Sequence, residues 1–182
     1  MDDRTVDPGW PRGQQLLWTL IPMSGYGMSR RLIGDGLVAL RQMFLKFAAI
    51  WIWVGFVVLL FVPPEDSPPN GWIALVVAVG IAAVIGVAVI HRVRRLDCSS
   101  ERALGSSYRA RTLTMLGVAI VPFAFGFFAA VADGRVLYLL AAPCAVVALA
   151  IAAPSVRDVR RSQARLEADG CIESLVGALR TA

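Results

Sequence analysis

The side chains that most often perform catalysis or bind metals are few in this sequence, and they are scattered. The 182 residues include one histidine, His91, and three cysteines, Cys98, Cys144 and Cys171. No CxxC pair occurs, and a lone histidine cannot complete a local structural zinc site. His91 could titrate near neutral pH, but the sequence shows no evident carboxylate partner for it. We therefore predict no catalytic residue, no cofactor and no metal site.

Acidic residues are also missing from the parts of the chain where a proton or ion relay would need them. The four longest apolar stretches contain no Asp or Glu. An ionisable residue in a membrane usually marks a transport path or a reaction centre, because placing one there is costly. We therefore expect that the protein is not an enzyme. A less favoured hypothesis is a membrane enzyme with its polar groups at the surface, around His91, Asp97, Glu101 and Tyr108.

The elements that carry these residues are predicted to be membrane helices. The chain is 57% hydrophobic and 17% charged, with a mean hydropathy of +0.65, which is too apolar for an ordinary soluble domain. Four stretches are long enough to cross a bilayer as helices, at about 43–62, 72–91, 113–132 and 136–153. The predicted fold is an all-α integral membrane protein in which four transmembrane helices form two hairpins.

Arginines predict the orientation of these spans. The net charge of +5 would suggest nucleic acid as a partner of a soluble chain. Here the bases concentrate before the first span, between the second and third, and after the fourth. Such alternation follows the positive-inside rule. We expect a multi-pass protein of the plasma membrane with both termini in the cytoplasm and no nucleic-acid partner.

Outside the spans we predict two flanking regions. Residues 1–42 form a cytoplasmic and interfacial segment, with an apolar stretch at 16–21 and an amphipathic helix at 29–44. Residues 43–153 form the membrane domain. Residues 154–182 form an amphipathic tail, with a polar helix at 155–169 closed by Gly170 and a short apolar pattern from Ile172 to Leu179 that should lie on the membrane or on a partner. Because two of the three cysteines fall on the reducing side, we expect no disulfide.

Three patterns are candidate functional features. Small residues recur every four positions in the second span and predict a helix-packing face, at Ala74, Ala78, Ala82 and Gly86. The opposite surface should face lipid, with Ile73, Val76, Val84 and Val87. Pro122 and Pro143 predict kinks at similar depth in the third and fourth spans, which could shape a neutral groove or be simple packing kinks. The tail contains four clustered arginines that could bind anionic lipid or only set topology: Arg157, Arg160, Arg161 and Arg165.

The region from Leu104 to Leu179 resembles a group of small four-span actinobacterial membrane proteins of unassigned function. The resemblance rests on Tyr108 and Arg109, on VPFAFGFF around Pro122 and Gly126, and on a tail pattern with Pro154, Gln163, Leu166, Gly170 and Ser174 to Leu179. A looser comparison of that group with proteolipid subunits of rotary ATP synthases implies a membrane carboxylate near Ile120, which this sequence lacks. The resemblance implies no activity.

These patterns favour a non-catalytic accessory or scaffold subunit that packs its helices against a larger membrane complex or against further copies of itself. The alternative is a transport or lipid-handling protein that uses a neutral groove in the hairpin of the third and fourth spans. The lipid bilayer is the one partner that both hypotheses require, and anionic lipid is a further candidate.

Overall fold

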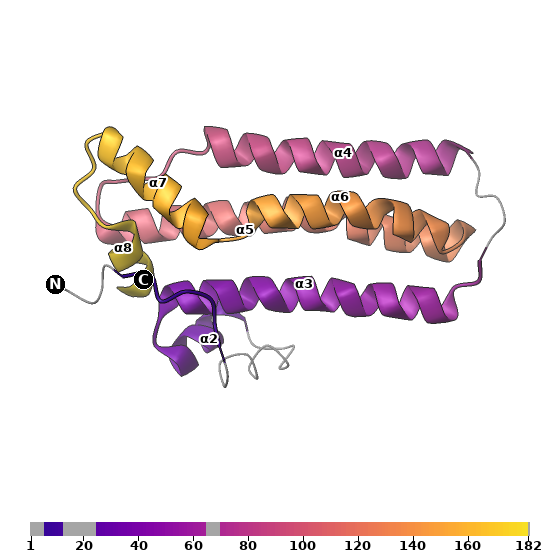
Figure 1. Cartoon of the computed structure of the whole chain (residues 1–182), viewed down its shortest axis with the longest axis horizontal. Helices are drawn as coiled ribbons and strands as arrows, with labels where there is room; N and C mark the ends of the chain where they lie inside the picture. Colours follow the sequence, from indigo (N-terminus) through magenta and orange to yellow (C-terminus); the bar gives the residue numbers. More distant parts are fainter. Residues whose placement is uncertain (1–5, 13–24, 65–69, 182) are drawn as a thin grey trace. The chain divides into compact units, whose positions relative to one another are not determined.

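The computed structural model describes residues 6–12, 25–64 and 70–181, and within them it contains helices and no strands (Figure 1). The predicted apolar stretch at 16–21 lies outside the described residues. The chain forms two compact units. The first unit takes its described residues from 1–47, 94–112 and 153–182, and the second consists of the described parts of 48–93 and 113–152.

Among the described residues, three helices are long and apolar enough to cross a membrane: α3 (Gly36–Phe61), α4 (Asn70–Val93) and α5 (Glu101–Asp133). The helix α6 (Val136–Ala152) qualifies as a fourth candidate only together with α7 (Val156–Ala168). A short break separates the two helices, and their axes differ in direction by 48°. The prediction of several candidate membrane-spanning helices is therefore confirmed, and their number among the described residues is three to four.

In the second unit, α4 packs along α6. The contact face of α4 carries Val76, Gly80, Ala83 and Val87, all buried. An added Cβ at Gly80 would lie 2.8 Å from the Cβ of Cys144, so glycine is required for this close approach. Our prediction that Val76 and Val87 face lipid is therefore wrong. Every face of this helix is apolar, so no polar side indicates which face packs against a neighbouring helix.

The helices α5 and α6 also approach closely. A Cβ at Gly126 would lie 2.6 Å from the Cβ of Ala141. The hydroxyl of Tyr138 donates to the carbonyl of Trp51 on α3 at 2.8 Å. Phe123 lies between these two aromatic residues, with ring centroids 5.9 Å from each. The interior of the second unit is thus formed by small residues on the helix contacts and by aromatic rings between them.

The predicted interfacial helix at 29–44 is wrong, because the chain breaks at Gly34. The helix α2 (Tyr26–Ile33) ends there with φ +74°, a left-handed conformation that glycine adopts at little cost. Asp35 then begins α3: its Oδ1 accepts from the amides of Leu37 at 3.0 Å and Val38 at 3.2 Å. The second half of the predicted helix is therefore the first part of α3.

The first unit has an apolar core of its own. It combines residues from α3, α5, α7 and the short helix α8 (Leu175–Thr181). Leu175 and Leu179 of α8 are completely buried, whereas Ile172 is 99% exposed. The expectation that this apolar pattern lies on the membrane or on a partner is wrong, since the chain itself covers it.

The tail helix predicted at 155–169 is confirmed by α7. The Ser155 side chain accepts from the amide of Asp158 at 3.1 Å and caps the N-terminus. Beyond its C-terminus, Gly170 has φ +83°. The amide of Cys171 then donates to the carbonyl of Leu166 at 2.8 Å, which completes the turn.

Cys98 and Cys171 form a disulfide, contrary to our expectation, with their Cα atoms 6.1 Å apart and 73 positions apart in sequence. The bond joins the segment before α5 to the segment between α7 and α8. Sequence separation hid this pair, because the compact first unit brings the two segments together. Cys144 of α6 is a free thiol.

Candidate functional site

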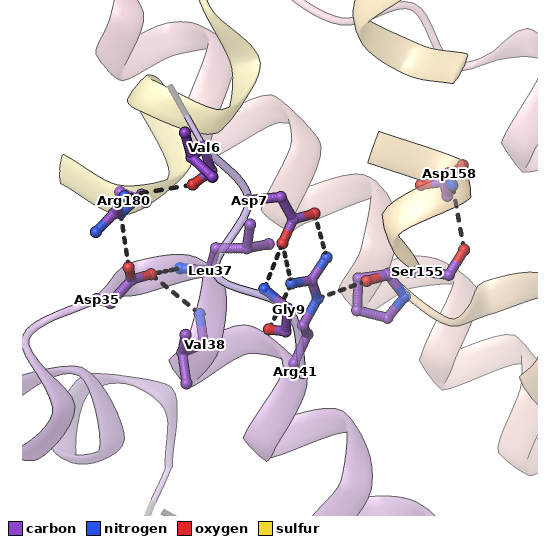
Figure 2. A network of polar contacts seen from close by, with 11 residues as sticks. Val6, Asp7, Gly9, Asp35, Leu37, Val38, Arg41, Ser155, Asp158 and Arg180 are labelled. Atoms are coloured by element: carbon purple, nitrogen blue, oxygen red, sulfur yellow. Dashed lines mark hydrogen bonds and ion pairs between the residues drawn. The ribbon is translucent and has the colours of Figure 1, made fainter. Parts of the chain in front are cut away.

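The guanidinium of Arg41 is the centre of a buried polar network in the first unit (Figure 2). Its Nη1 and Nη2 donate to the two carboxylate oxygens of Asp7 at 2.5 and 2.8 Å. Nη1 also donates to the carbonyl of Gly9 at 2.7 Å, and Nε to that of Pro154 at 2.9 Å. Trp10 lies beside the guanidinium, with its ring centroid 5.5 Å away. Arg41 therefore joins the N-terminal segment, α3 and the start of the tail.

The charge of Arg41 is compensated by this geometry. A buried ion pair is tolerated when it is bidentate and its other donors find acceptors, as they do here. Burial raises the pKa of the Asp7 carboxyl, but hydrogen bonds from Arg41 and the Gly9 amide and the charges of Arg41 and Arg160 outweigh this and lower it below 3.8. Asp7 thus stays ionised, and the network is structural.

A second buried network joins α5 to α7. The hydroxyl of Tyr108 donates to Oδ2 of Asp158 at 2.7 Å. Arg111 donates from Nη2 to the same oxygen at 3.3 Å and to Oγ of Ser162 at 3.0 Å. Tyr108 is 0% and Arg111 3% exposed, so the pair is shielded from solvent. A tyrosine next to a carboxylate can do acid–base chemistry, but this one is enclosed and fixes the position of α7.

The hypothesis of a surface enzyme grouped Tyr108 with His91, Asp97 and Glu101. Tyr108 is buried, whereas Asp97 and Glu101 are exposed. The carboxylate of Asp97 accepts a hydrogen bond from the amide of Ser99 at 2.9 Å and so closes a local turn. Hydrogen bonds from Ser99 lower the pKa of this exposed carboxyl. Glu101 is exposed in the first turn of α5. Across the described part of the chain, no three His, Cys, Asp or Glu side chains are arranged to hold a metal ion.

The predicted packing face of α4 points away from α6. Ala74, Ala78 and Ala82 are exposed, and Gly86 is half-buried, with an added Cβ 3.4 Å from Val118. The larger side chain of Ile85 is exposed on the same side of the helix. The small residues that α4 buries within this chain are Gly80 and Ala83.

Pro122 and Pro143 lie inside α5 and α6, and both helices continue through them. Pro122 is buried and Pro143 is exposed. Phe123, 5% exposed, and Tyr138, 4% exposed, fill the interior next to Pro122. The neutral groove of the alternative hypothesis would have to form where these aromatic side chains pack.

All four clustered arginines of the tail are exposed on α7. They are Arg157, Arg160, Arg161 and Arg165. The opposite side of the helix buries Asp158, Val159, Ser162 and Leu166. The structure thus separates a basic outer face from a mixed inner face that holds the helix in the first unit.

Sequence reasoning missed both networks. Arg41 carried one signal, because a charge within the apolar run from Leu37 to Phe44 must find a partner if the run is buried. Nothing in the sequence identified Asp7 as that partner, 34 positions away. Asp158 in the first turn of α7 is an ordinary N-terminal acid, and its bond to Tyr108, 50 positions away, has no local signature.

Comparison with known proteins identifies no relatives. The chain matches no protein-family model, and no curated protein and no solved structure is significantly similar to it. The resemblance of residues 104–179 to small actinobacterial membrane proteins therefore remains a hypothesis, and the function has to be inferred from the molecule alone.

Proposed function

We propose that this chain is a non-catalytic scaffold or accessory subunit of the plasma membrane, which binds a partner helix through α4. The observation that carries the proposal is the exposed face formed by Ala74, Ala78 and Ala82. Helices associate in lipid through close packing and not through the hydrophobic effect, so small residues at this spacing favour contact with another helix. The contact between α4 and α6 uses the other side of the helix and leaves this face accessible.

Four spans in two hairpins, with both termini in the cytoplasm, are supported by the composition of the first unit. The three segments that the arginine pattern assigns to the cytoplasm belong to it. Between them the chain leaves this unit twice, as 48–93 and as 113–152, and each excursion contains two apolar helical segments. A chain that returns to its starting side has to cross an even number of times, and a hairpin of two spans is the shortest solution.

The buried networks support a structural role for the ionisable groups of the first unit. Arg41 and Asp7 form one ion pair, and Arg111 and Asp158 form another. Breaking such a pair leaves an uncompensated buried charge, which costs about 3–5 kcal/mol. Residues paired in this way are engaged in the packing of the unit, which supports a structural role for them.

Leucine substitutions on α4 test the proposal. We expect Ala78→Leu and Ala82→Leu to reduce recovery of a partner protein, or of a homo-oligomer, from native membranes in mild detergent. The matched control is Ala150→Leu, which makes the same change at an exposed alanine of α6. Monomer stability should be unchanged in all three variants, because each position is exposed. Equal recovery from the three variants and the wild type would eliminate α4 as the contact.

A further inference from the structure

The helix α7 is held in a fixed position by its inner face. Asp158 and Ser162 bind Arg111, and Asp158 also accepts from Tyr108, as described above. Val159 is 1% exposed and packs in the apolar core of the first unit. Because this side of the helix is immobilised, the side chains on the other side project from a rigid frame. Such preorganisation lowers the entropic cost of ordering the protein when a ligand binds.

The outer face of α7 carries Arg157, Arg161 and Arg165, which are exposed and spaced four residues apart. We call these three residues the arginine face. Ala164 and Ala168 are exposed on the same side, so small residues lie beside the three long cationic side chains. Three positive charges are thereby concentrated along about two turns of helix.

Among the described residues, no ion pair joins a carboxylate of α7 to the arginine face. Asp158 is engaged on the inner side, and Glu167 accepts from Nε2 of Gln163 at 2.9 Å. Arg160 differs from the other three arginines, because it lies near enough to Asp7 to help lower the pKa of that carboxyl. We therefore exclude Arg160 from the arginine face.

We propose that the arginine face binds the phosphate groups of anionic phospholipids, in the leaflet from which α6 emerges. Guanidinium groups match phosphate oxygens in charge and in bidentate geometry. Val156, the first residue of α7, follows Ala152, the last residue of α6, by four positions. At about 3.4 Å per extended residue and about 1.5 Å per helical residue, Arg165 is at most about 30 Å from the end of the span. A tether of this length lets the face reach lipid headgroups, whereas any partner that is not tethered must diffuse to the site.

The test uses the full-length protein in mild detergent, titrated with phosphatidylglycerol and, separately, with phosphatidylcholine, while native mass spectrometry counts the bound lipids. The variant carries Arg157→Gln, Arg161→Gln and Arg165→Gln together. A base near a membrane surface contributes about 1 kcal/mol, which is about a fivefold change in affinity, so we expect losses of up to about a hundredfold for phosphatidylglycerol. Affinity for phosphatidylcholine should not change.

The control variant removes the same charge elsewhere in the first unit, with Arg31→Gln, Arg95→Gln and Arg102→Gln, three exposed positions. It should bind phosphatidylglycerol as the wild type does, and equal weakening in both variants would reduce the effect to net charge and overturn the proposal. Lysine at the three positions of the arginine face keeps the charge but not the bidentate geometry, so it should restore part of the affinity that glutamine removes. Affinity no higher than that of the glutamine variant, in a folded protein, would contradict an electrostatic site.

A third arm adds a short duplex oligonucleotide at physiological salt. If the wild type binds it more tightly than phosphatidylglycerol, and the glutamine variant loses that binding, the face recognises nucleic acid and the lipid proposal is wrong. The inference does not depend on a partner for α4, since lipid binding by α7 and recovery of a partner are measured separately.

Discussion

Replacing Gly126 by alanine should weaken the contact between α5 and α6, whereas the same change at Gly117 should not. Both glycines lie in α5, so each substitution gains the same helix propensity, about 1 kcal/mol. The new methyl at 126 would lie 2.6 Å from the Cβ of Ala141. Carbon atoms in contact need about 3.5–4.0 Å, so the two helices have to separate by about 1 Å. At Gly117 nothing lies within 4 Å of the added methyl.

The difference between the two variants isolates the packing cost. Inserting a methyl into a filled contact costs about 1–3 kcal/mol. For a chain of this size, 1 kcal/mol shifts the melting temperature by about 2–4 °C, so Gly126→Ala should melt about 2–12 °C below Gly117→Ala. Thermal unfolding of the purified protein in detergent, followed by tryptophan fluorescence, measures this difference.

A compensating change on α6 tests whether the contact with Ala141 causes the loss of stability. Adding Ala141→Gly to Gly126→Ala moves the methyl from one helix to the other, and the nearest remaining atom is the Cα of Tyr138 at 3.4 Å. A double-mutant cycle should then give a favourable coupling of about 1–3 kcal/mol. If Gly126→Ala is as stable as Gly117→Ala, or if the coupling is zero, α5 and α6 do not approach at Gly126.

Three further predictions concern the first unit, and the same unfolding assay measures each. Asp158→Asn leaves Arg111 buried without a counter-charge and should lower the free energy of unfolding by about 3–5 kcal/mol. Tyr108→Phe removes one hydrogen bond and should lower it by about 1–2 kcal/mol. Equal effects of the two variants would contradict the network. Because the pKa of Asp7 is lowered by folding, its contribution should be complete above about pH 4 and disappear as the pH falls below that value, and Asp7→Asn should abolish this acid dependence. The disulfide of Cys98 closes a loop with a sequence separation of 73 and should stabilise the oxidised protein by up to about 4 kcal/mol, so a reductant should lower the melting temperature of the wild type but not that of the Cys98→Ser variant.

Much of the helical framework could be predicted from the sequence, because length and apolarity alone determine which segments can cross a bilayer. The predicted spans at 43–62 and 72–91 overlap α3 and α4; α3 begins earlier, at Gly36, and α4 extends beyond its predicted span at both ends. The tail helix was predicted from its ends, where Ser155 and Gly170 provide the cap and the left-handed turn. These features depend on local chemistry, and local chemistry is what a sequence displays.

The side on which each helix packs could not be predicted. Inside lipid, an apolar face is equally suited to the bilayer and to another helix, so α4 carried no polar residue that oriented it. Gly80, which lacks a Cβ, was the residue that indicated the packing side. The more regular spacing of Ala74, Ala78 and Ala82 favoured the wrong side of the helix for the contact with α6. A short apolar pattern like that of α8 is similarly ambiguous, because a membrane surface and a protein core both bury it.

The arginines and the disulfide indicate different compartments for the first unit. The positive-inside rule assigns the exposed arginines to the cytoplasm, where thiols are normally reduced. Cys98 and Cys171 are both half-exposed and accessible to small thiols and disulfides. We therefore expect both thiols to be free in growing cells and to close on exchange with oxidised glutathione, which yields the protein disulfide and two molecules of reduced glutathione. Acid quenching of intact cells, alkylation and mass spectrometry measure the two states. A bond already closed before oxidant is added would place this unit on the oxidising side, and the orientation derived from the arginines would then have to be reversed.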